Sequence, residues 1–470
     1  MRKTKILATV GPASDRPARL RELLRAGTDG FRLNFSHGTD AEHRATLRRM
    51  REAARQAGRD VAIVADVQGP KIRIGALAAP AISLEPGQSL RLDADSRPGD
   101  GRRVGVQLPS FVRAARPGDP VLLGDGVVEL RVERVRRGAI ETRVISGGTV
   151  SGHAGIYLPR AHLRVEVFGP KDRHDAQIGL RGGTDFVALS FVRDASDVVR
   201  ARRWLDHQAG GREVGLIAKI ERRDALDEID GILSAADGIM VARGDLGIEV
   251  PLERLALEQK RLVRKANVAG KFVIVATQML LSMIHSPRPT RAEATDVANA
   301  VLDGADAVML SEESAVGEFP VEAVRWLARI AEATEPAYDA RGLRELLRAT
   351  PPGAPSERSV AAAAVTLAEG VRARAIATPT HSGRTARTVA ALRPTAPVVA
   401  LSHSAPARRR LALVRGVRTL PVPAHRNLIE LRDHVAALVD STSFAGPGPI
   451  VLTAGYPVEG RPTNLVTLVD

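Results

Sequence analysis

The chain has 470 residues, of which 44% are hydrophobic and 3% aromatic, and it carries a formal net charge of +14. This length allows two or three domains with separate cores, and the absence of cysteine excludes disulfides, thiol catalysis and zinc sites of the finger type. No apolar run approaches the ~20 residues of a membrane span, so we expect a cytoplasmic protein with no membrane partner.

The basic residues are spread through helix-like segments such as RATLRRMREAARQ (44–56), where arginines alternate with acidic and apolar residues. This pattern is typical of a solvated helix face rather than of a nucleic-acid surface. Motifs that combine aromatic and basic residues, as RNA-binding modules do, are absent from the sequence. Nucleic acid is therefore not expected as a partner.

Short runs rich in Val, Ile, Leu and Ala recur along the chain, with amphipathic segments such as 16–27 and 251–270 between them. Near-continuous apolar strands that alternate with helices indicate a parallel sheet, and eight such units predict a closed (β/α)8 TIM barrel. The predicted strands are 5–11, 30–36, 61–69, 185–191, 213–221, 237–247, 271–279 and 306–313.

Two other segments do not follow this alternation of strands and helices. More than a hundred residues without a good helix separate the third and fourth strands, and their alternating runs and Gly-containing turns predict a small inserted β-barrel that could act as a lid. A Pro/Ser-rich linker, RATPPGAPSERS (348–359), precedes an open α/β pattern. The expected domains are a catalytic barrel (1–70 and 168–345), an inserted lid (71–167) and a C-terminal α/β domain (346–470).

Catalytic residues of a β/α barrel lie at the carboxyl ends of its strands. Polar and charged residues follow most of the predicted strands at this point. They are Arg32, Asn34 and Ser36, then Asp66 with Arg73 just beyond it, Lys219 and Glu221, Arg243, Gly244 and Asp245, Thr277 and Gln278, and Ser311 and Glu313.

The chemical types in this set favour phosphoryl transfer. Glu221 and Asp245 are hard oxygen ligands with no histidine nearby, which suits Mg²⁺ or Mn²⁺ rather than zinc. Lys219, Arg32 and Arg73 are the cations that a phosphoryl group requires, and no covalent nucleophile is evident. Any one of these residues could simply cap a strand or a helix, but their joint presence favours an anion-plus-metal site.

Several stretches also form a family signature: KILATVGPAS, RLNFSHG, GPKIR, LSFVR, IAKIE, DGIMVARGDLG, VATQML, SPRPTRAEATDVANAVLDGADAVMLSEES and, more weakly, GRPTNLV. On these motifs the chain resembles the pyruvate kinases over almost its whole length. The resemblance implies transfer of the phosphoryl group of phosphoenolpyruvate to ADP, giving pyruvate and ATP in the last step of glycolysis. It also implies a regulatory C-terminal domain and a homotetramer.

The resemblance assigns roles to the residues at the strand ends. It implies that Glu221 and Asp245 hold the divalent metal and that Lys219 contacts the phosphoryl group while it is transferred. It also implies that Arg73 and Arg32 bind phosphate oxygens. It further implies that the Gly244–Asp245 backbone and Thr277 receive the carboxylate of phosphoenolpyruvate. Protonation of the enolate is left open between Thr277 and a water chain reaching Ser311 and Glu313. The positions associated with the nucleotide are Thr9, Pro12, Arg32, His37 and Lys171.

Three positions depart from the family pattern. The usual Gly of MLSGE is Glu312, an Asn that often follows the IAKIE strand is Arg222, and the usual Lys-Gly-x-Asn near the return of the lid is AGIY (154–157). The first adds a charge beside the proton-relay candidates, and the third bears on the hinge or the nucleotide contacts. None of them removes a residue assigned to chemistry.

Lys71 in GPKIR is unusual because the chain has 8 lysines against 60 arginines. Many pyruvate kinases have Glu here and need K⁺, held by residues matching Asn34, Ser36 and Asp66, whereas members with lysine resemble enzymes that need no monovalent cation. The companion residues Val67, Gln68 and Ile74 agree with the second group. An ammonium is a compact charge that can replace K⁺, so we expect no K⁺ requirement. The alternative is a surface lysine in a turn.

The C-terminal domain contains TPTHSGRTAR, in which a Ser/Gly/Thr loop opens a helix. Free backbone N–H groups at a helix start bind anions, and the family places a phosphorylated effector at this loop. An ordinary N-capped helix is the alternative. The effector candidates are Ser382, Gly383, Arg384 and Thr385, while Arg384 and the terminal loop GYPVEGRPTN leave the identity of the effector open.

Two other functions compete with this interpretation. A metal-dependent aldolase or lyase that handles pyruvate enolate would use a similar Glu/Asp pair, but it has no use for the lid, Arg73 or Lys219. A basic RNA-associating protein with a vestigial site would explain the net charge, but the metal pair and the lysine are intact. Activity that requires ADP would exclude the first, and an RNA retardation assay would test the second.

Overall fold

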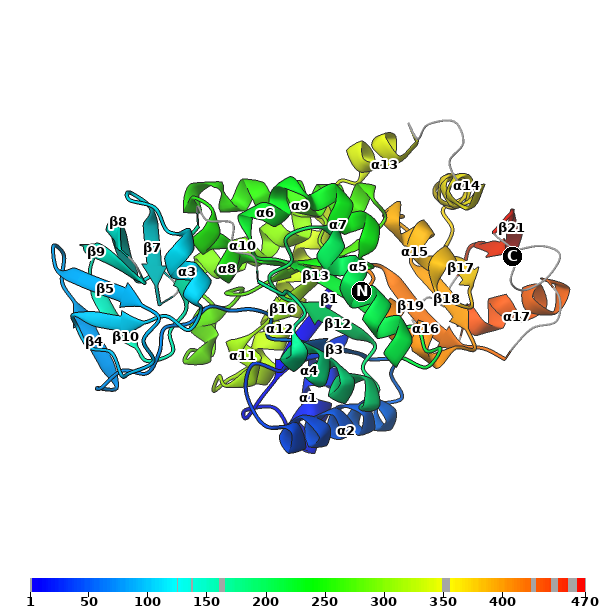
Figure 1. The fold of residues 1–470 in the computed structure, drawn as a ribbon. Helices are drawn as coiled ribbons and strands as arrows, with labels where there is room; N and C mark the ends of the chain where they lie inside the picture. Colours follow the sequence, from blue (N-terminus) through cyan, green and yellow to red (C-terminus); the bar gives the residue numbers. More distant parts are fainter. Residues whose placement is uncertain are drawn as a thin grey trace.

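A closed barrel of eight parallel strands forms the centre of the molecule, with the lid sheet at one end and the C-terminal sheet at the other (Figure 1). The computed structural model describes residues 2–124, 126–136, 138–159, 165–348, 356–423, 428–440, 447–454 and 463–469. The predicted fold class, a TIM barrel with an inserted β-domain and a C-terminal α/β domain, is confirmed.

The barrel strands are almost entirely buried because helices cover their outer face and side chains fill the interior. Around the barrel the order is β1-β16-β15-β14-β13-β12-β3-β2. Inside it, Phe186 and Phe272 pack edge to face at 5.3 Å, and Leu413 of the C-terminal domain joins the same cluster. The strands are β1 (Lys5–Val10), β2 (Gly30–Asn34), β3 (Ala62–Asp66), β12 (Phe186–Leu189), β13 (Gly215–Ile220), β14 (Gly238–Ala242), β15 (Phe272–Ala276) and β16 (Ala307–Leu310).

The outer helices begin and end at recognisable signals. Thr39 and Glu42 form a capping box at the start of α2, Thr290 and Glu293 form another at α10, and α1 ends at Gly27 with a φ of 119°. The helices are α1 (Pro17–Ala26), α2 (Asp40–Gln56), α4 (Pro170–Arg181), α5 (Ala195–Gln208), α6 (Arg223–Asp227), α7 (Ile229–Ala235), α8 (Arg243–Glu249), α9 (Leu255–Val268), α10 (Arg291–Asp303), α11 (Glu312–Ala315) and α12 (Pro320–Thr334). Short 3₁₀ turns occupy Leu252–Arg254, Leu281–Ile284 and Glu335–Ala337.

Several sequence-based boundaries differ from the structure, among them the following three. The predicted strand 237–247 ends at Ala242, because the chain turns into α8 and thereby buries Leu246 completely. The predicted helix 251–270 divides into a 3₁₀ turn and α9. The end of the predicted linker 348–359 belongs to a helix that starts at Ser356, whereas residues 349–355 lie outside the described part of the chain.

The lid has its own hydrophobic core and two sheets. Where the sequence predicts a small β-barrel, the described strands form a six-stranded sheet, β11-β7-β8-β9-β5-β6, beside the pair β10-β4. The interval between the third and fourth barrel strands, predicted to lack a good helix, contains two helices among its described residues: the short α3 (Pro109–Ala114) in the lid and the 12-residue α4 (Pro170–Arg181) before β12, so that prediction is wrong. The strands are β4 (Ala81–Leu84), β5 (Ser89–Asp93), β6 (Arg103–Gly105), β7 (Pro120–Leu123), β8 (Val128–Arg136), β9 (Ala139–Ser146), β10 (Gly148–Ser151) and β11 (Ile156–Tyr157).

The C-terminal domain is the predicted open α/β sheet, with the strand order β19-β18-β17-β20-β21. Only β21 runs antiparallel to its neighbour. The strands are β17 (Ala375–Pro379), β18 (Val398–Ser402), β19 (Val417–Pro421), β20 (Ile450–Ala454) and β21 (Leu465–Val469). The helices are α13 (Arg341–Arg348), α14 (Ser356–Gly370), α15 (Arg384–Ala391), α16 (Ala405–Leu411) and α17 (Leu428–Asp440).

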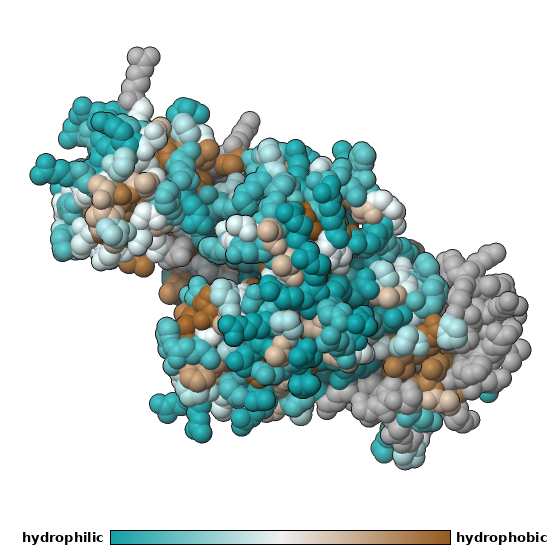
Figure 2. Space-filling model, turned by 90° about the horizontal axis from the view of Figure 1, so that it is seen from below, coloured by the Kyte–Doolittle hydropathy of each residue, from teal (hydrophilic) through white to brown (hydrophobic). Residues whose placement is uncertain are grey.

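The surface seen in Figure 2 is mainly hydrophilic over the barrel, with hydrophobic residues in small separate groups. This agrees with the interpretation of the arginine-rich segments as solvated helix faces. Within the described ranges, no helix combines the length and the apolar character needed to cross a membrane.

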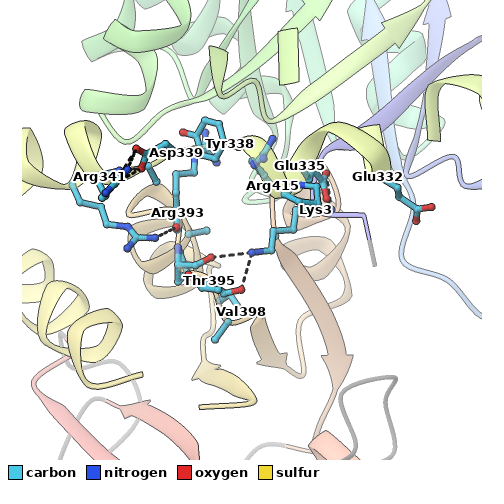
Figure 3. Close-up of a pocket in the computed structure, with 17 residues that line it drawn as sticks. Lys3, Glu332, Glu335, Tyr338, Asp339, Arg341, Arg393, Thr395, Val398 and Arg415 are labelled. Atoms are coloured by element: carbon cyan, nitrogen blue, oxygen red, sulfur yellow. Dashed lines mark hydrogen bonds and ion pairs between the residues drawn. The ribbon is translucent and has the colours of Figure 1, made fainter. Parts of the chain in front are cut away.

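A cavity of about 500 Å³ lies where the barrel meets the C-terminal domain (Figure 3). Lys3 donates to the backbone oxygens of Pro394 and Thr395 at 3.2 and 2.7 Å, and the Arg415 guanidinium stacks on Tyr338 at 4.6 Å. Burial, together with the neighbouring charge of Arg415, lowers the pKa of Lys3. The contacts of Lys3 tie the segment before β1 to the loop between α15 and β18 of the C-terminal domain.

A buried ion pair beside this cavity also links the two domains. Arg393 meets Asp306 through two bonds of 2.8 and 2.9 Å, with side chains only 4% and 3% exposed. Arg393 also has a φ of 52°, a conformation that a non-glycine residue keeps only when its surroundings hold it. Asp306 directly precedes β16, so this pair connects the C-terminal domain to a barrel strand.

Arg393→Ala is expected to lower the free energy of unfolding by about 3–5 kcal/mol, because the Asp306 carboxylate stays buried without its guanidinium partner. Urea unfolding followed by circular dichroism measures this change. Arg341→Ala is the matched control, since its pair with Asp339 lies at the same cavity but is exposed. Equal unfolding midpoints for the two variants would contradict a structural role for the buried pair.

Candidate active site

The carboxyl ends of the barrel strands bring the predicted site residues to one rim. Arg32 lies on β2 and Asp66 ends β3, with Asn34 directly opposite Asp66 in the strand register. Lys219 lies on β13, and Glu221 follows it immediately. The rim is completed by Asp245 in α8, Thr277 after β15, and Ser311 and Glu313 after β16.

Lys219 is the centre of this rim. Its ammonium lies 2.9 Å from Glu221 Oε1 and 3.2 Å from Asp66 Oδ1, and it donates to Ser190 Oγ at 2.8 Å. Burial alone would lower the pKa of Lys219, but the charges of Asp66 and Glu221 outweigh burial and raise the pKa above its ordinary value. Lys219 therefore carries a fixed positive charge at the mouth of the barrel.

Arg32 and Asp66 form a second pair beside Lys219. Arg32 Nε lies 2.6 Å from Asp66 Oδ2, and Arg32 also donates to Thr9 Oγ1 at 3.0 Å. Burial opposes the charged form of Asp66, but Lys219 and Arg32 lower its pKa. Asp66 is thus a permanent anion that holds both cations in place, although the sequence assigns it only to a monovalent-cation site.

The chemistry of Glu221 and Asp245 fits a divalent cation. Glu221 is 2% exposed, and burial together with the charge of Asp245 raises its pKa despite the nearby Lys219. Two carboxylates that repel each other in a buried site are stabilised by a cation. Within the described residues no group of three or more His, Cys, Asp or Glu side chains could hold a metal. The pair of carboxylates suits Mg²⁺, which takes one or two carboxylates and fills its shell with water and phosphate oxygens.

Lys71 lies beside Asp245. Its ammonium is 3.2 Å from Asp245 Oδ1, and the hydroxyl of Tyr157 donates to the same oxygen at 2.8 Å. Asp66, which the sequence groups with Lys71, is paired with Arg32 and Lys219 instead. Lys71 is therefore a residue of the barrel mouth rather than a solvated turn residue, with a side chain 21% exposed.

Thr277 is held in a strained conformation. Its φ is 69°, which is exceptional for a β-branched residue. Its hydroxyl accepts from the Gly244 backbone N–H at 2.8 Å, and Arg243 donates to its carbonyl oxygen at 2.8 Å while pairing with Asp296. Such strain is characteristic of functional sites where the surroundings fix the conformation.

Glu313 is fully buried, and its carboxylate accepts backbone N–H bonds from Leu280 and Ser311 at 3.0 and 2.7 Å. Burial raises its pKa, and the charge of the neighbouring Glu312 acts in the same direction. The departure at Glu312 therefore favours the protonated form of Glu313.

The candidates for the nucleotide lie on or just after β1 and β2 and at the start of α4. Thr9 donates to the Leu310 carbonyl oxygen at 2.7 Å, and Pro12 follows β1. Lys171 donates to the carbonyl oxygen of Phe35 at 3.1 Å, which places it beside the loop that carries Ser36 and His37. Arg73 donates to the His153 carbonyl oxygen at 3.0 Å, within the base of the lid.

Comparison with known proteins identifies the family. Residues 1–324 match the model of the pyruvate kinase barrel domain, and residues 358–469 match that of the pyruvate kinase alpha/beta domain. The chain belongs to the pyruvate kinase family.

Individual pyruvate kinases are similar to this chain over almost its full length. The chain is 44% identical to the pyruvate kinase of Geobacillus stearothermophilus over 473 residues, covering 99% of this chain and 80% of that protein. It is also 44% identical to a pyruvate kinase of Agrobacterium vitis over 471 residues, covering 99% and 98%. The crystal structure of a pyruvate kinase from Cryptosporidium parvum superimposes with a TM-score of 0.94 at 36% identity, covering 100% of this chain and 96% of that one.

As a member of the family the enzyme is a phosphotransferase that transfers the phosphoryl group of phosphoenolpyruvate to ADP, giving pyruvate and ATP. Pyruvate kinases generally use Mg²⁺. The comparisons favour neither an aldolase or lyase nor an RNA-associating protein.

Sequence reasoning missed two residues of this pyruvate kinase site: Ser190, which bridges Lys219 to the Val67 carbonyl oxygen, and Tyr157, which reaches Asp245. Arg243 was expected at a strand end, but its role in holding Thr277 was not predicted. Ser190 lies in the quoted motif LSFVR, so its position after a barrel strand was a usable signal. The signal for Tyr157 was its departure from the family pattern at the return of the lid.

The predicted effector loop lies at the start of α15. Gly383 has a φ of 86°, and its N–H donates to Thr380 Oγ1 at 2.9 Å. Thr385 Oγ1 lies 2.7 Å from Thr463 Oγ1, and Arg384 is 3.9 Å from Glu357 with 71% of its side chain exposed. Most of the terminal loop GYPVEGRPTN, residues 455–462, lies outside the described part of the chain.

Proposed function

We propose that Lys219, Glu221 and Asp245 carry the pyruvate kinase reaction of this enzyme. The supporting observation is the ammonium of Lys219, buried between Asp66 and Glu221 at the mouth of the barrel. Glu221 and Asp245 would hold Mg²⁺ or Mn²⁺, which when bound neutralises charge on the phosphate oxygens. Exchange of Lys219 for methionine tests this assignment.

The remaining rim residues bind and orient the two substrates. Arg32 and Arg73 clamp phosphate oxygens, and the Gly244–Asp245 backbone with Thr277 receives the carboxylate of phosphoenolpyruvate. The Thr277 hydroxyl accepts from the Gly244 N–H and donates to the Ala276 carbonyl oxygen at 2.6 Å, so the two groups lie side by side and would exchange these bonds for the carboxylate. The nucleotide lies along Thr9, Pro12, Arg32, His37 and Lys171.

Lys219 offsets the charge that develops on the phosphoryl group as its bond to the enolate oxygen breaks and its bond to the ADP oxygen forms. The enolate carbon then takes a proton. Thr277 supports one route, since its hydroxyl lies at the rim, and a water chain reaching Ser311 and Glu313 supports the other. The raised pKa of Glu313 favours the protonated form of its carboxyl group, which can donate a proton to such a water chain.

K⁺ is not required in this proposal, because the ammonium of Lys71 supplies the positive charge beside the substrate phosphate. Its position 3.2 Å from Asp245 supports this role. Asn34, Ser36 and Asp66 match the K⁺ ligands of other members. In this proposal they do not bind K⁺. Activity in potassium-free buffer tests the proposal.

A phosphorylated effector would bind at Ser382, Gly383, Arg384 and Thr385. We also expect the enzyme to be a cytoplasmic homotetramer. The exposure of Arg384 and the position of Gly383 at the start of α15 support an anion site there.

Sugar phosphates or AMP are then expected to shift the phosphoenolpyruvate saturation curve, and the double variant Ser382→Ala/Arg384→Ala is expected to abolish the shift while keeping the maximal rate. Thr388→Ala, on the same helix and half-buried, is the control that should retain the shift. A wild-type enzyme that responds to none of these phosphorylated metabolites would support the capped-helix alternative.

A further inference from the structure

The base of the lid is a short antiparallel ladder between the two segments that join it to the barrel. Ile74 N–H donates to Ala154 at 3.0 Å, Ile156 N–H donates to Ile72 at 3.1 Å, and Arg73 pairs with Gly155. Since paired residues in an antiparallel ladder keep a constant sum of positions, Lys71 lies opposite Tyr157. Two residues far apart in the chain thus become a cross-strand pair.

The ladder separates apolar from polar side chains by the alternation of a strand. Ile74 and Ile156 are buried in the core of the lid. Lys71 and Tyr157 belong to the other face, where both reach Asp245 in α8 of the barrel. The base of the lid is therefore in direct contact with a proposed metal ligand.

Both contacts are made to one atom. The hydroxyl of Tyr157 donates to Asp245 Oδ1 at 2.8 Å, and the ammonium of Lys71 lies 3.2 Å from the same oxygen. A carboxylate oxygen has two lone pairs, so these two donors occupy it. Among the described residues, no hydrogen bond reaches Asp245 Oδ2.

We propose that Tyr157 is a positioning residue for the metal site, which fills Asp245 Oδ1 together with Lys71 and leaves Oδ2 for the divalent cation. The proposal rests on the proposed function, in which Asp245 holds that cation. Carboxylates that bind metals are oriented by hydrogen bonds to their other oxygen, and loss of such a partner weakens metal binding about 10–100-fold.

Tyr157 also acts on Lys71. The ammonium lies 5.7 Å from the centre of the Tyr157 ring, within the range of a cation–π contact. Lys71 and Tyr157 both stand where this chain departs from motifs common in the family, and the contact between ring and ammonium brings the two departures together.

Gly155 makes room for this arrangement. A Cβ atom at Gly155 would lie 3.0 Å from Cε2 and 3.1 Å from the hydroxyl oxygen of Tyr157, and 3.2 Å from Cε of Lys71. Gly155→Ala would therefore displace both side chains without removing an atom from either. It is an independent means of disturbing the same contact.

Binding of Mn²⁺ alone to the full-length enzyme, measured by electron paramagnetic resonance without substrates, tests the proposal. Tyr157→Phe keeps the buried ring and removes the hydroxyl, and we expect its Kd for Mn²⁺ to rise tenfold or more. Tyr338→Phe is the matched control, the same substitution at the interface with the C-terminal domain, and its Kd should stay within twofold of wild type. Gly155→Ala should weaken Mn²⁺ binding in the same direction as Tyr157→Phe.

Asp245→Asn separates the proposal from the function on which it rests. If Asp245→Asn abolishes Mn²⁺ binding while Tyr157→Phe and Gly155→Ala stay within twofold of wild type, Tyr157 has no positioning role and the metal site stands. If Asp245→Asn binds Mn²⁺ as wild type does, both assignments are overturned. Should Tyr157→Phe fail to fold, as circular dichroism would show, Gly155→Ala alone decides between these outcomes.

Discussion

Lys219→Met is expected to lower kcat by a factor of ~10²–10³ or more, the usual effect of removing one preorganised charge that stabilises a transition state. A factor of 10³ corresponds to about 4 kcal/mol of barrier. The KM for phosphoenolpyruvate should change much less, since Arg32, Arg73 and the metal carboxylates remain. A coupled assay of pyruvate formation measures both quantities.

The control for this experiment is a lysine outside the site. Lys260 pairs with Asp303 on the outer helices, so Lys260→Met should retain wild-type turnover. Arg32 still neutralises Asp66 in Lys219→Met, and we therefore expect a folded variant. Turnover near the wild-type value in Lys219→Met would refute the assignment of phosphoryl transfer to this group.

The enzyme is expected to reach full activity in sodium-free and potassium-free buffer that contains only Mg²⁺ and a bulky organic cation. Lys71→Glu should lower this activity and make the remainder respond to K⁺ by about tenfold or more, equivalent to ~1.4 kcal/mol of barrier. The physical reason is charge: a carboxylate in place of the ammonium beside Asp245 creates a local excess of negative charge that a bound cation relieves.

Lys71→Met distinguishes loss of the ammonium from gain of a cation ligand. This variant lacks the charge but offers no oxygen for K⁺, so its activity should fall and stay insensitive to K⁺. Rates at increasing K⁺ for the wild type and both variants provide the comparison. A wild-type enzyme stimulated tenfold or more by K⁺ would contradict the proposal.

The barrel and the open C-terminal sheet were predictable because parallel strands are buried on both faces and appear as near-continuous apolar runs. The helix α8 was not predictable from the sequence, although its residues form part of the motif MVARGDLG. Arg243, Gly244 and Asp245 follow β14 without a break, and the chain becomes helical there because Leu246 packs into the core and Gly244 reaches Thr277. Both are tertiary contacts that local patterning does not contain.

The candidate site was also predictable only in part. Residue type and position at a strand end suffice to bring Lys219, Glu221 and Asp245 to one rim, because barrel closure places all carboxyl ends on the same side. The partner of each side chain depends on distances between strands that are remote in sequence. The sequence placed Lys71 with Asn34, Ser36 and Asp66, a grouping that stays a prediction, whereas the structure sets its ammonium against Asp245, 174 positions away.

Tyr157 is the clearest example of what tertiary structure alone decides. In the sequence it is one departure in a four-residue motif at the return of the lid, with no feature that points to a metal site. It meets Asp245, 88 positions further along the chain, because the ladder at the base of the lid sets it opposite Lys71 and the barrel brings α8 beneath that ladder. Local sequence thus decided the strands, the helices and the chemical types at the rim, while the register between distant segments decided which atoms meet.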